Sequence, residues 1–104
     1  MTETTKEIIY LLDQEFESRI RLGIMSVLMV NDKSEFKTMK DLLDTTDGNL
    51  ASHLRGLGKA GYIQVKKQFV ARKPNSTYSI TRQGKKAFED HLNQLEKYLK
   101  KHKS

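Results

Sequence analysis

The sequence predicts a mainly α-helical domain of the α+β class that contains one small β-hairpin. Apolar residues recur three or four positions apart through most of the chain, which is the spacing of amphipathic helices. Between residues 62 and 81 the pattern changes to an alternation of apolar and polar residues, which is typical of strands. Helical spacing returns from residue 82. A chain of 104 residues is long enough for one hydrophobic core, so we expect a single domain over residues 1–104.

The first third of the chain predicts two helices and a short strand. A narrow apolar stripe indicates a helix over residues 5–16, and its members are Ile8, Ile9, Leu12 and Phe16. Ser18 is a suitable N-cap for a second helix over residues 19–31, because a serine hydroxyl accepts an unpaired N–H of the first turn. This helix has a broad apolar face and is expected at the centre of the core. Residues 35–37 predict a short strand.

Residues 37–62 predict two further helices, over 39–45 and 47–60, joined by a tight turn. Leu50, Leu54 and Leu57 form one buried stripe on the second of them. The residues that point away from this stripe are small or polar, namely Gly48, Asn49, Ser52, Arg55, Gly56 and Lys59. A helix of this kind fits the major groove of DNA, so sequence-specific DNA binding is the leading hypothesis. Gly56 costs about 1 kcal/mol relative to alanine in a helix interior, and a close approach of DNA or another helix would explain it.

Residues 62–81 predict an antiparallel hairpin with a basic tip. Its strands are expected over 62–69 and 77–81, and its turn over 72–76, which contains the chain's only proline. Ile63, Val65 and Phe69 are expected to share one face of the hairpin, and Tyr78 and Ile80 are expected to point inward. A last helix over 82–101 has an apolar seam at heptad spacing, formed by Phe88, Leu92, Leu95 and Leu99.

Composition excludes several classes of protein. The chain has no cysteine, and its three histidines lie far apart in the sequence, so we expect no disulfide, metal site or cofactor. It shows no motif of a nucleophile, a phosphate-binding glycine loop or a carboxylate pair, which argues against an enzyme. No apolar run approaches the length of a membrane span, and the polar N-terminus lacks the order of a signal peptide. We therefore expect a cytoplasmic protein without a membrane partner.

The two parts of the chain differ in charge. Residues 1–61 hold 8 Lys and Arg against 10 Asp and Glu, whereas residues 62–104 hold 11 against 3. The net charges are therefore −2 and +8, and the positive charge follows the predicted helix pair. This asymmetry favours a polyanionic partner, with nucleic acid first and an anionic membrane surface second. The alternative is a lysine-rich surface that only keeps a small protein in solution.

The predicted order of elements is that of a winged helix-turn-helix with additional N- and C-terminal helices. The chain resembles the winged-helix regulators of the MarR and ArsR type, and most closely their compact winged-helix DNA-binding subfamily. The resemblance covers residues 19–84, roughly the expected core at 18–84. It rests on the TDGNLASHL run from residue 46, on Leu57 with the AGYI run from residue 60, and on Lys67, Phe69, Arg72, Pro74, Thr77, Tyr78 and the TRQGK run from residue 81.

The resemblance implies two surfaces that contact double-stranded DNA. The first turn and outer face of the second helix of the pair form the first surface, with Thr46, Asp47, Gly48, Asn49, Ser52, His53, Arg55 and Lys59. The hairpin, as the wing, forms the second surface, with Lys67, Arg72 and Lys73. His53 has the alternative of a packed, hydrogen-bonded histidine. Arg72 has the alternatives of a solvated turn or a pair with a carboxylate, although Val70 stands where many MarR-type wings carry an aspartate.

The resemblance also implies a homodimer that acts as a transcriptional regulator. Its interface is expected on the flanking helices 5–16 and 82–101, with Ile8, Ile9, Leu12, Phe16, Phe88, Leu92, Leu95 and Leu99. The alternative is that these two apolar stripes pack against each other within one monomer. An unidentified small-molecule effector would be typical of the family. The competing function is a winged helix that serves as a protein-interaction or assembly module without sequence-specific DNA binding.

Overall fold

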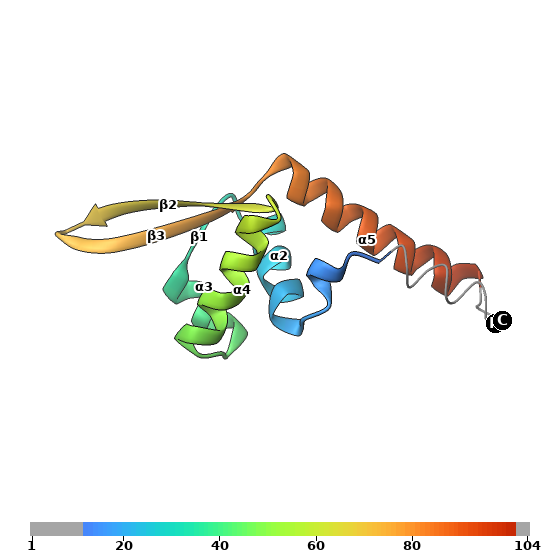
Figure 1. Cartoon of the computed structure of the whole chain (residues 1–104), viewed down its shortest axis with the longest axis horizontal. Helices are drawn as coiled ribbons and strands as arrows, with labels where there is room; N and C mark the ends of the chain where they lie inside the picture. The colour runs from blue at the N-terminus through green and yellow to red at the C-terminus, as the bar shows by residue number, and fades with distance from the viewer. Residues whose placement is uncertain (1–11, 102–104) are drawn as a thin grey trace.

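The structure is a computed structural model that describes residues 12–101 (Figure 1). The elements follow in the order η1 (Gln14–Phe16), α2 (Arg19–Val30), β1 (Ser34–Glu35), α3 (Phe36–Leu43), α4 (Asp47–Lys59), β2 (Ile63–Val70), β3 (Lys73–Ile80) and α5 (Arg82–Lys101). The three strands form one antiparallel sheet in the order β1-β3-β2. This is the predicted α+β class, with helices α3 and α4 as the helix pair and β2 and β3 as the hairpin.

Side-chain caps set the beginnings of the three longest helices. The hydroxyl oxygens of Ser18, Thr46 and Thr81 each accept a backbone N–H from the first turn of α2, α4 and α5, at 3.1, 3.1 and 2.9 Å respectively. Gly61 follows α4 with a φ of 82°, a left-handed conformation that glycine adopts without steric cost. The predicted bounds of these helices are therefore confirmed to within one residue.

One hydrophobic core lies between α2, α3, α4 and the base of the hairpin. Helix α2 is at its centre, as predicted, because four of its side chains are buried. The buried apolar residues are Phe16, Ile20, Ile24, Met25, Leu28, Met39, Leu50, Leu54, Leu57, Ile63 and Phe88. The predicted stripe on α4 is thus confirmed, since all three of its leucines belong to this core.

Three predictions for the elements around this core are wrong. The helix expected over residues 39–45 is α3, which begins three residues earlier, at Phe36, and ends at Leu43. The strand expected over residues 35–37 is β1, which ends at Glu35, and Phe36 already opens α3. β1 is this short because only two of its residues pair with β3, Ser34 with Tyr78 and Glu35 with Thr77. The helix expected over residues 5–16 is, in its described part, only the single turn η1, which Asp13 caps by accepting the N–H of Glu15 at 2.9 Å. Ile8 and Ile9 lie outside the described residues.

The hairpin projects from the body of the molecule (Figure 1), and its turn differs from the prediction. The turn consists of Ala71 and Arg72, whose φ values of 51° and 66° are those of a two-residue type I′ turn. Pro74 lies within β3, opposite Phe69, rather than in the turn. Proline is tolerated there for two reasons. Phe69 and Pro74 form the non-hydrogen-bonded pair next to the closing pair Val70–Lys73, so β2 does not require the missing N–H. On the other side of β3, β1 does not extend this far.

Ile63, Val65 and Phe69 share one face of the hairpin, as predicted, and Tyr78 and Ile80 pack against the core, but of the three β2 residues only Ile63 is buried. The side chain of Ile63 is 4% exposed, whereas Val65 is 45% and Phe69 76% exposed. The alternation places these residues on one face of the hairpin, but the hairpin extends beyond the body, so no other element of the described structure covers its outer half. Within residues 12–101, no helix has both the length and the apolar character needed to cross a membrane.

Candidate nucleic-acid interface

The outer face of α4 is polar and exposed. Gly48, Asn49, Ser52, Arg55 and Lys59 are all exposed, and they lie opposite the leucine stripe that anchors the helix in the core. The sequence prediction of inner and outer faces is therefore correct for these five residues. Small polar side chains allow a helix to approach another surface closely. Two exposed cations, Arg55 and Lys59, lie on its C-terminal half.

Hydrogen bonds organise the first turn of α4. Thr46 caps the helix, and Asp47 forms an ion pair with Lys40 of α3 at 2.9 Å. The hydrogen bond to Asp47 raises the pKa of Lys40. The side-chain amide of Asn49 donates to the hydroxyl of Thr45 at 2.8 Å, which leaves its carbonyl oxygen directed at no protein donor among the described residues. The turn between α3 and α4 thus fixes the position of Asn49 before any ligand binds.

The wing carries four cations that form no ion pair with a carboxylate of the described residues. Lys67, Arg72 and Lys73 are exposed, as is Lys66. The ion pairs found within residues 12–101 involve other cations, and none of them lies on the wing. An arginine–carboxylate pair that would fix the wing is therefore absent from the described structure. The four charges together produce a positive field at the tip of the hairpin.

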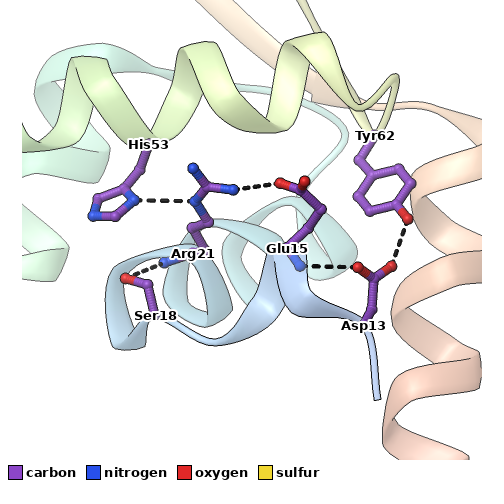
Figure 2. A network of polar contacts seen from close by, with 6 residues as sticks. All are labelled: Asp13, Glu15, Ser18, Arg21, His53 and Tyr62. Atoms are coloured by element: carbon purple, nitrogen blue, oxygen red, sulfur yellow. Dashed lines mark hydrogen bonds and ion pairs between the residues drawn. The ribbon is translucent and has the colours of Figure 1, made fainter. Parts of the chain in front are cut away.

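His53 does not lie on the outer face of α4 and is directed toward α2. Figure 2 shows its imidazole beside Arg21, whose Nε donates to its Nδ1 at 3.1 Å. The guanidinium of Arg21 also forms an ion pair with Glu15 of η1. Burial lowers the pKa of His53, and the charge of Arg21 lowers it further. The assignment of His53 to DNA is corrected accordingly, and the alternative of a hydrogen-bonded, packed histidine describes the structure.

The same network explains Gly56, which the sequence pattern assigned to the outer face. A Cβ at Gly56 would overlap the guanidinium of Arg21, so this glycine makes room for an α2 side chain. The network continues at the other end of η1, where the hydroxyl of Tyr62 donates to Asp13 at 2.5 Å (Figure 2). That hydrogen bond raises the pKa of Tyr62 to about 12. These polar contacts join η1, α2, α4 and β2.

Two residues assigned to the dimer interface are buried within a single chain. Phe16 and Phe88 are 1% and 4% exposed, and their rings meet edge to face with centroids 5.3 Å apart. They pack the start of α5 onto η1, so they are not available to a partner, and this part of the prediction is wrong. Leu12 and Leu95 are half-buried. Leu92 and Leu99 remain exposed on α5, which extends away from the helices α2–α4 (Figure 1).

This arrangement of a helix pair followed by a projecting hairpin matches a known family. The family of winged helix DNA-binding domains matches residues 20–99. This chain belongs to that family. Its sequence is 31% identical over 80 residues to an uncharacterised protein of Methanocaldococcus jannaschii. The matched region covers 77% of this chain and 87% of that relative.

Solved structures of winged-helix proteins support the same conclusion. A transcriptional regulator homologue from Pyrococcus horikoshii OT3 superimposes with a TM-score of 0.84 at 30% identity, over 98% of this chain and 99% of that one. A MarR-family regulator from Enterococcus faecalis V583 has the same fold, with a TM-score of 0.70 at 22% identity, over 97% and 88% of the two chains. The chain is thus a winged-helix DNA-binding regulator rather than an enzyme. The predicted resemblance to MarR-type regulators is confirmed at the level of the fold.

The sequence did not point to the residues that hold α4 in place. Arg21, Glu15 and Asp13 belong to no motif, and the bonds from Arg21 to His53 and from Tyr62 to Asp13 join residues 32 and 49 positions apart. The one signal was Gly56, because a glycine inside a helix indicates a close approach of some other group. Among the described residues, no group of three or more potential ligands could hold a metal ion.

Proposed function

We propose that this winged-helix protein is a homodimeric transcriptional regulator that binds a pseudo-palindromic DNA site. In each subunit, α4 enters the major groove and the wing contacts the adjacent minor groove. The observation that carries the proposal is the combination of an exposed, small and polar outer face on α4 with the unpaired cations of the wing. The proposed location of this regulator is the cytoplasm, where it would bind chromosomal DNA.

On α4, side chains of the first two turns are proposed to read base edges. The side-chain carbonyl oxygen of Asn49 is suited to accept a hydrogen bond from the amino group of adenine. Its Nδ2 can give up the hydrogen bond to the Thr45 hydroxyl and donate to a ring nitrogen of the same base instead. The hydroxyl of Ser52 lies one turn further along the same face. Arg55 and Lys59 follow toward the C-terminus, where they are proposed to contact phosphates.

The wing is proposed to place Arg72 in the minor groove. Arg72 occupies the second position of the turn, so its side chain starts from the outermost part of the hairpin. Narrow A·T-rich minor grooves have an enhanced negative potential that attracts arginine. Lys67 and Lys73 flank the turn on the two strands and are proposed to contact the backbone on either side.

Dimerisation is proposed to occur through the exposed part of α5. Leu92 and Leu99 are 45% and 64% exposed and lie seven residues apart on one face, with the half-buried Leu95 between them. A two-fold axis near α5 would place two copies of α4 about 34 Å apart, which is one turn of DNA. A small-molecule effector remains a prediction that rests on the family resemblance alone.

The test of DNA recognition is selection of bound duplexes from a random pool, followed by fluorescence anisotropy on the selected site. We expect a pseudo-palindromic site, and Asn49→Ala is expected to reduce discrimination at one base pair by about 1–3 kcal/mol. Asn93→Ala is the matched control, because Asn93 is an exposed asparagine on α5. If the intact protein binds no duplex even at low salt, the proposal is wrong and the protein-interaction module becomes the better hypothesis.

The test of the dimer is light scattering on the intact protein at tens of micromolar. Leu99→Glu is expected to shift the mass toward a monomer, because it places a charge in the proposed seam. Leu42→Glu on α3 is the matched control, since both leucines are 64% exposed. A monomeric intact protein, or a dimer that Leu99→Glu leaves unchanged, would contradict this interface.

A further inference from the structure

One face of the wing carries four apolar side chains, and three of them are exposed. The register of the hairpin places Val65 opposite Tyr78 and Phe69 opposite Pro74, and the alternation of the strands puts all four on the same face. We call this set of four residues the apolar track. Phe69 is 76% exposed, which is unusual for a phenylalanine because phenylalanine side chains are most often buried.

The apolar track begins beside α4 and ends at the tip of the wing. At its base, Val65 and Tyr78 line a hollow of about 420 Å³ together with Arg55 and Lys59 of α4. Further out, Phe69 and Pro74 line a second hollow of about 290 Å³ together with Lys67. The apolar residues that line the two hollows lie on the same face of the hairpin, between α4 and the turn.

Cations accompany the apolar track along its whole length. Arg55 and Lys59 stand at its base, Lys67 lies between Val65 and Phe69 on the same face, and Arg72 lies at its tip. These cations have no ion pair within the described residues. A partner that covers the track must therefore be anionic and must also present apolar surface between its charges.

We propose that the apolar track packs against the deoxyribose edges of one DNA strand, between phosphates that the flanking cations contact. This inference rests on the proposed DNA-binding function and adds a contribution to affinity that does not depend on salt. A DNA strand alternates charged phosphates with largely apolar sugars, which matches the alternation of cations and apolar side chains along the track. Burial of Phe69 removes apolar surface from water, whereas the lysines and arginines act by releasing counterions.

The experiment measures the affinity of the intact chain for a duplex over a series of salt concentrations. Phe69→Thr keeps a residue suited to a strand and removes the apolar ring. We expect this variant to bind about tenfold more weakly at every salt concentration, with the slope of log affinity against log salt unchanged. Lys67→Ala is instead expected to reduce that slope by about 0.9, the value for one phosphate contact.

Two further variants separate the proposed contact from a structural role of Phe69. Val70→Thr is the matched control, because Val70 is 52% exposed on the neighbouring position but lines a hollow on the opposite face of the wing. It is expected to bind DNA as the wild type does. Phe69→Leu is expected to restore most of the affinity, since it returns apolar surface.

Three results would overturn the inference. If Phe69→Thr binds the duplex as tightly as the wild type, the inference is wrong but the proposed DNA-binding function stands. A loss of affinity accompanied by a change in oligomeric state would show that a second copy of the chain covers the track. A wild-type protein that binds no duplex would refute the proposed function and this inference together.

Discussion

Two helical glycines are expected to respond in opposite ways to replacement by alanine. Gly84 is buried in the first turn of α5, where a Cβ would overlap the backbone carbonyl of Tyr62. That carbonyl accepts the N–H of Thr81 at 3.0 Å, so the start of α5 and the start of β2 are held together by their backbones. By contrast, Gly58 is exposed on α4, and no atom lies within 4 Å of the position of its Cβ.

The expected magnitudes follow from these surroundings. An added group in a packed site costs about 1–3 kcal/mol, and the upper end applies at Gly84 because a backbone carbonyl cannot rotate away as a side chain can. Alanine stabilises a helix by about 1 kcal/mol relative to glycine, which offsets part of this cost. Gly84→Ala is therefore expected to lower the free energy of unfolding by about 2 kcal/mol. In a chain of about 100 residues this lowers the melting temperature by about 8–16 °C. Gly58→Ala should gain about 1 kcal/mol.

The assay is urea denaturation of the wild type and both variants, followed by circular dichroism at one protein concentration. The concentration is held fixed because a dimer would make stability depend on it. A Gly84→Ala variant as stable as the wild type would show that α5 and β2 are not packed as tightly as the structure has them. A Gly58→Ala variant less stable than the wild type would show that this glycine has a contact among residues beyond those described.

Three further outcomes are expected. Thr46→Ala should lose about 1 kcal/mol in urea denaturation because it removes the α4 cap, and Thr46→Ser should retain most of it. Burial lowers the folded-state pKa of His53 and His91, so below about pH 6.5 the unfolded chain binds more protons than the folded chain. The free energy of unfolding should therefore fall as the pH decreases through about 6.5. Replacing both histidines by glutamine should flatten this pH profile. Tyr62→Phe should lose about 1.5–3 kcal/mol because it leaves the carboxylate of Asp13 without its phenol donor, and an equally stable variant would contradict this bond.

Local signals allowed the helices to be predicted. Ser18 and Thr46 accept N–H groups only two or three residues away, so a cap depends on sequence neighbours and not on the rest of the fold. Helix α4 was located for the same reason, since its leucine spacing and the left-handed Gly61 that follows it are both local features. The outer face of α4 follows directly from that spacing.

The wing was predicted less well, because its length and turn depend on pairing between strands. The only proline suggested a turn at Pro74, but that residue lies within β3. The turn instead contains Ala71 and Arg72, which rarely adopt a positive φ. Alternation indicated that Val65 and Phe69 share a face, but it contained no information on whether another element covers that face.

The sequence by itself determined the class of the fold, the position of α4, and the polar character of the face that it presents. These depend on periodicity and caps, which act over a few residues. Only the tertiary structure decided that Gly56 and His53 face Arg21, that Phe16 and Phe88 pack within one chain, and that Phe69 is left uncovered. Each of these depends on the path by which distant segments meet, and no local pattern specifies that path.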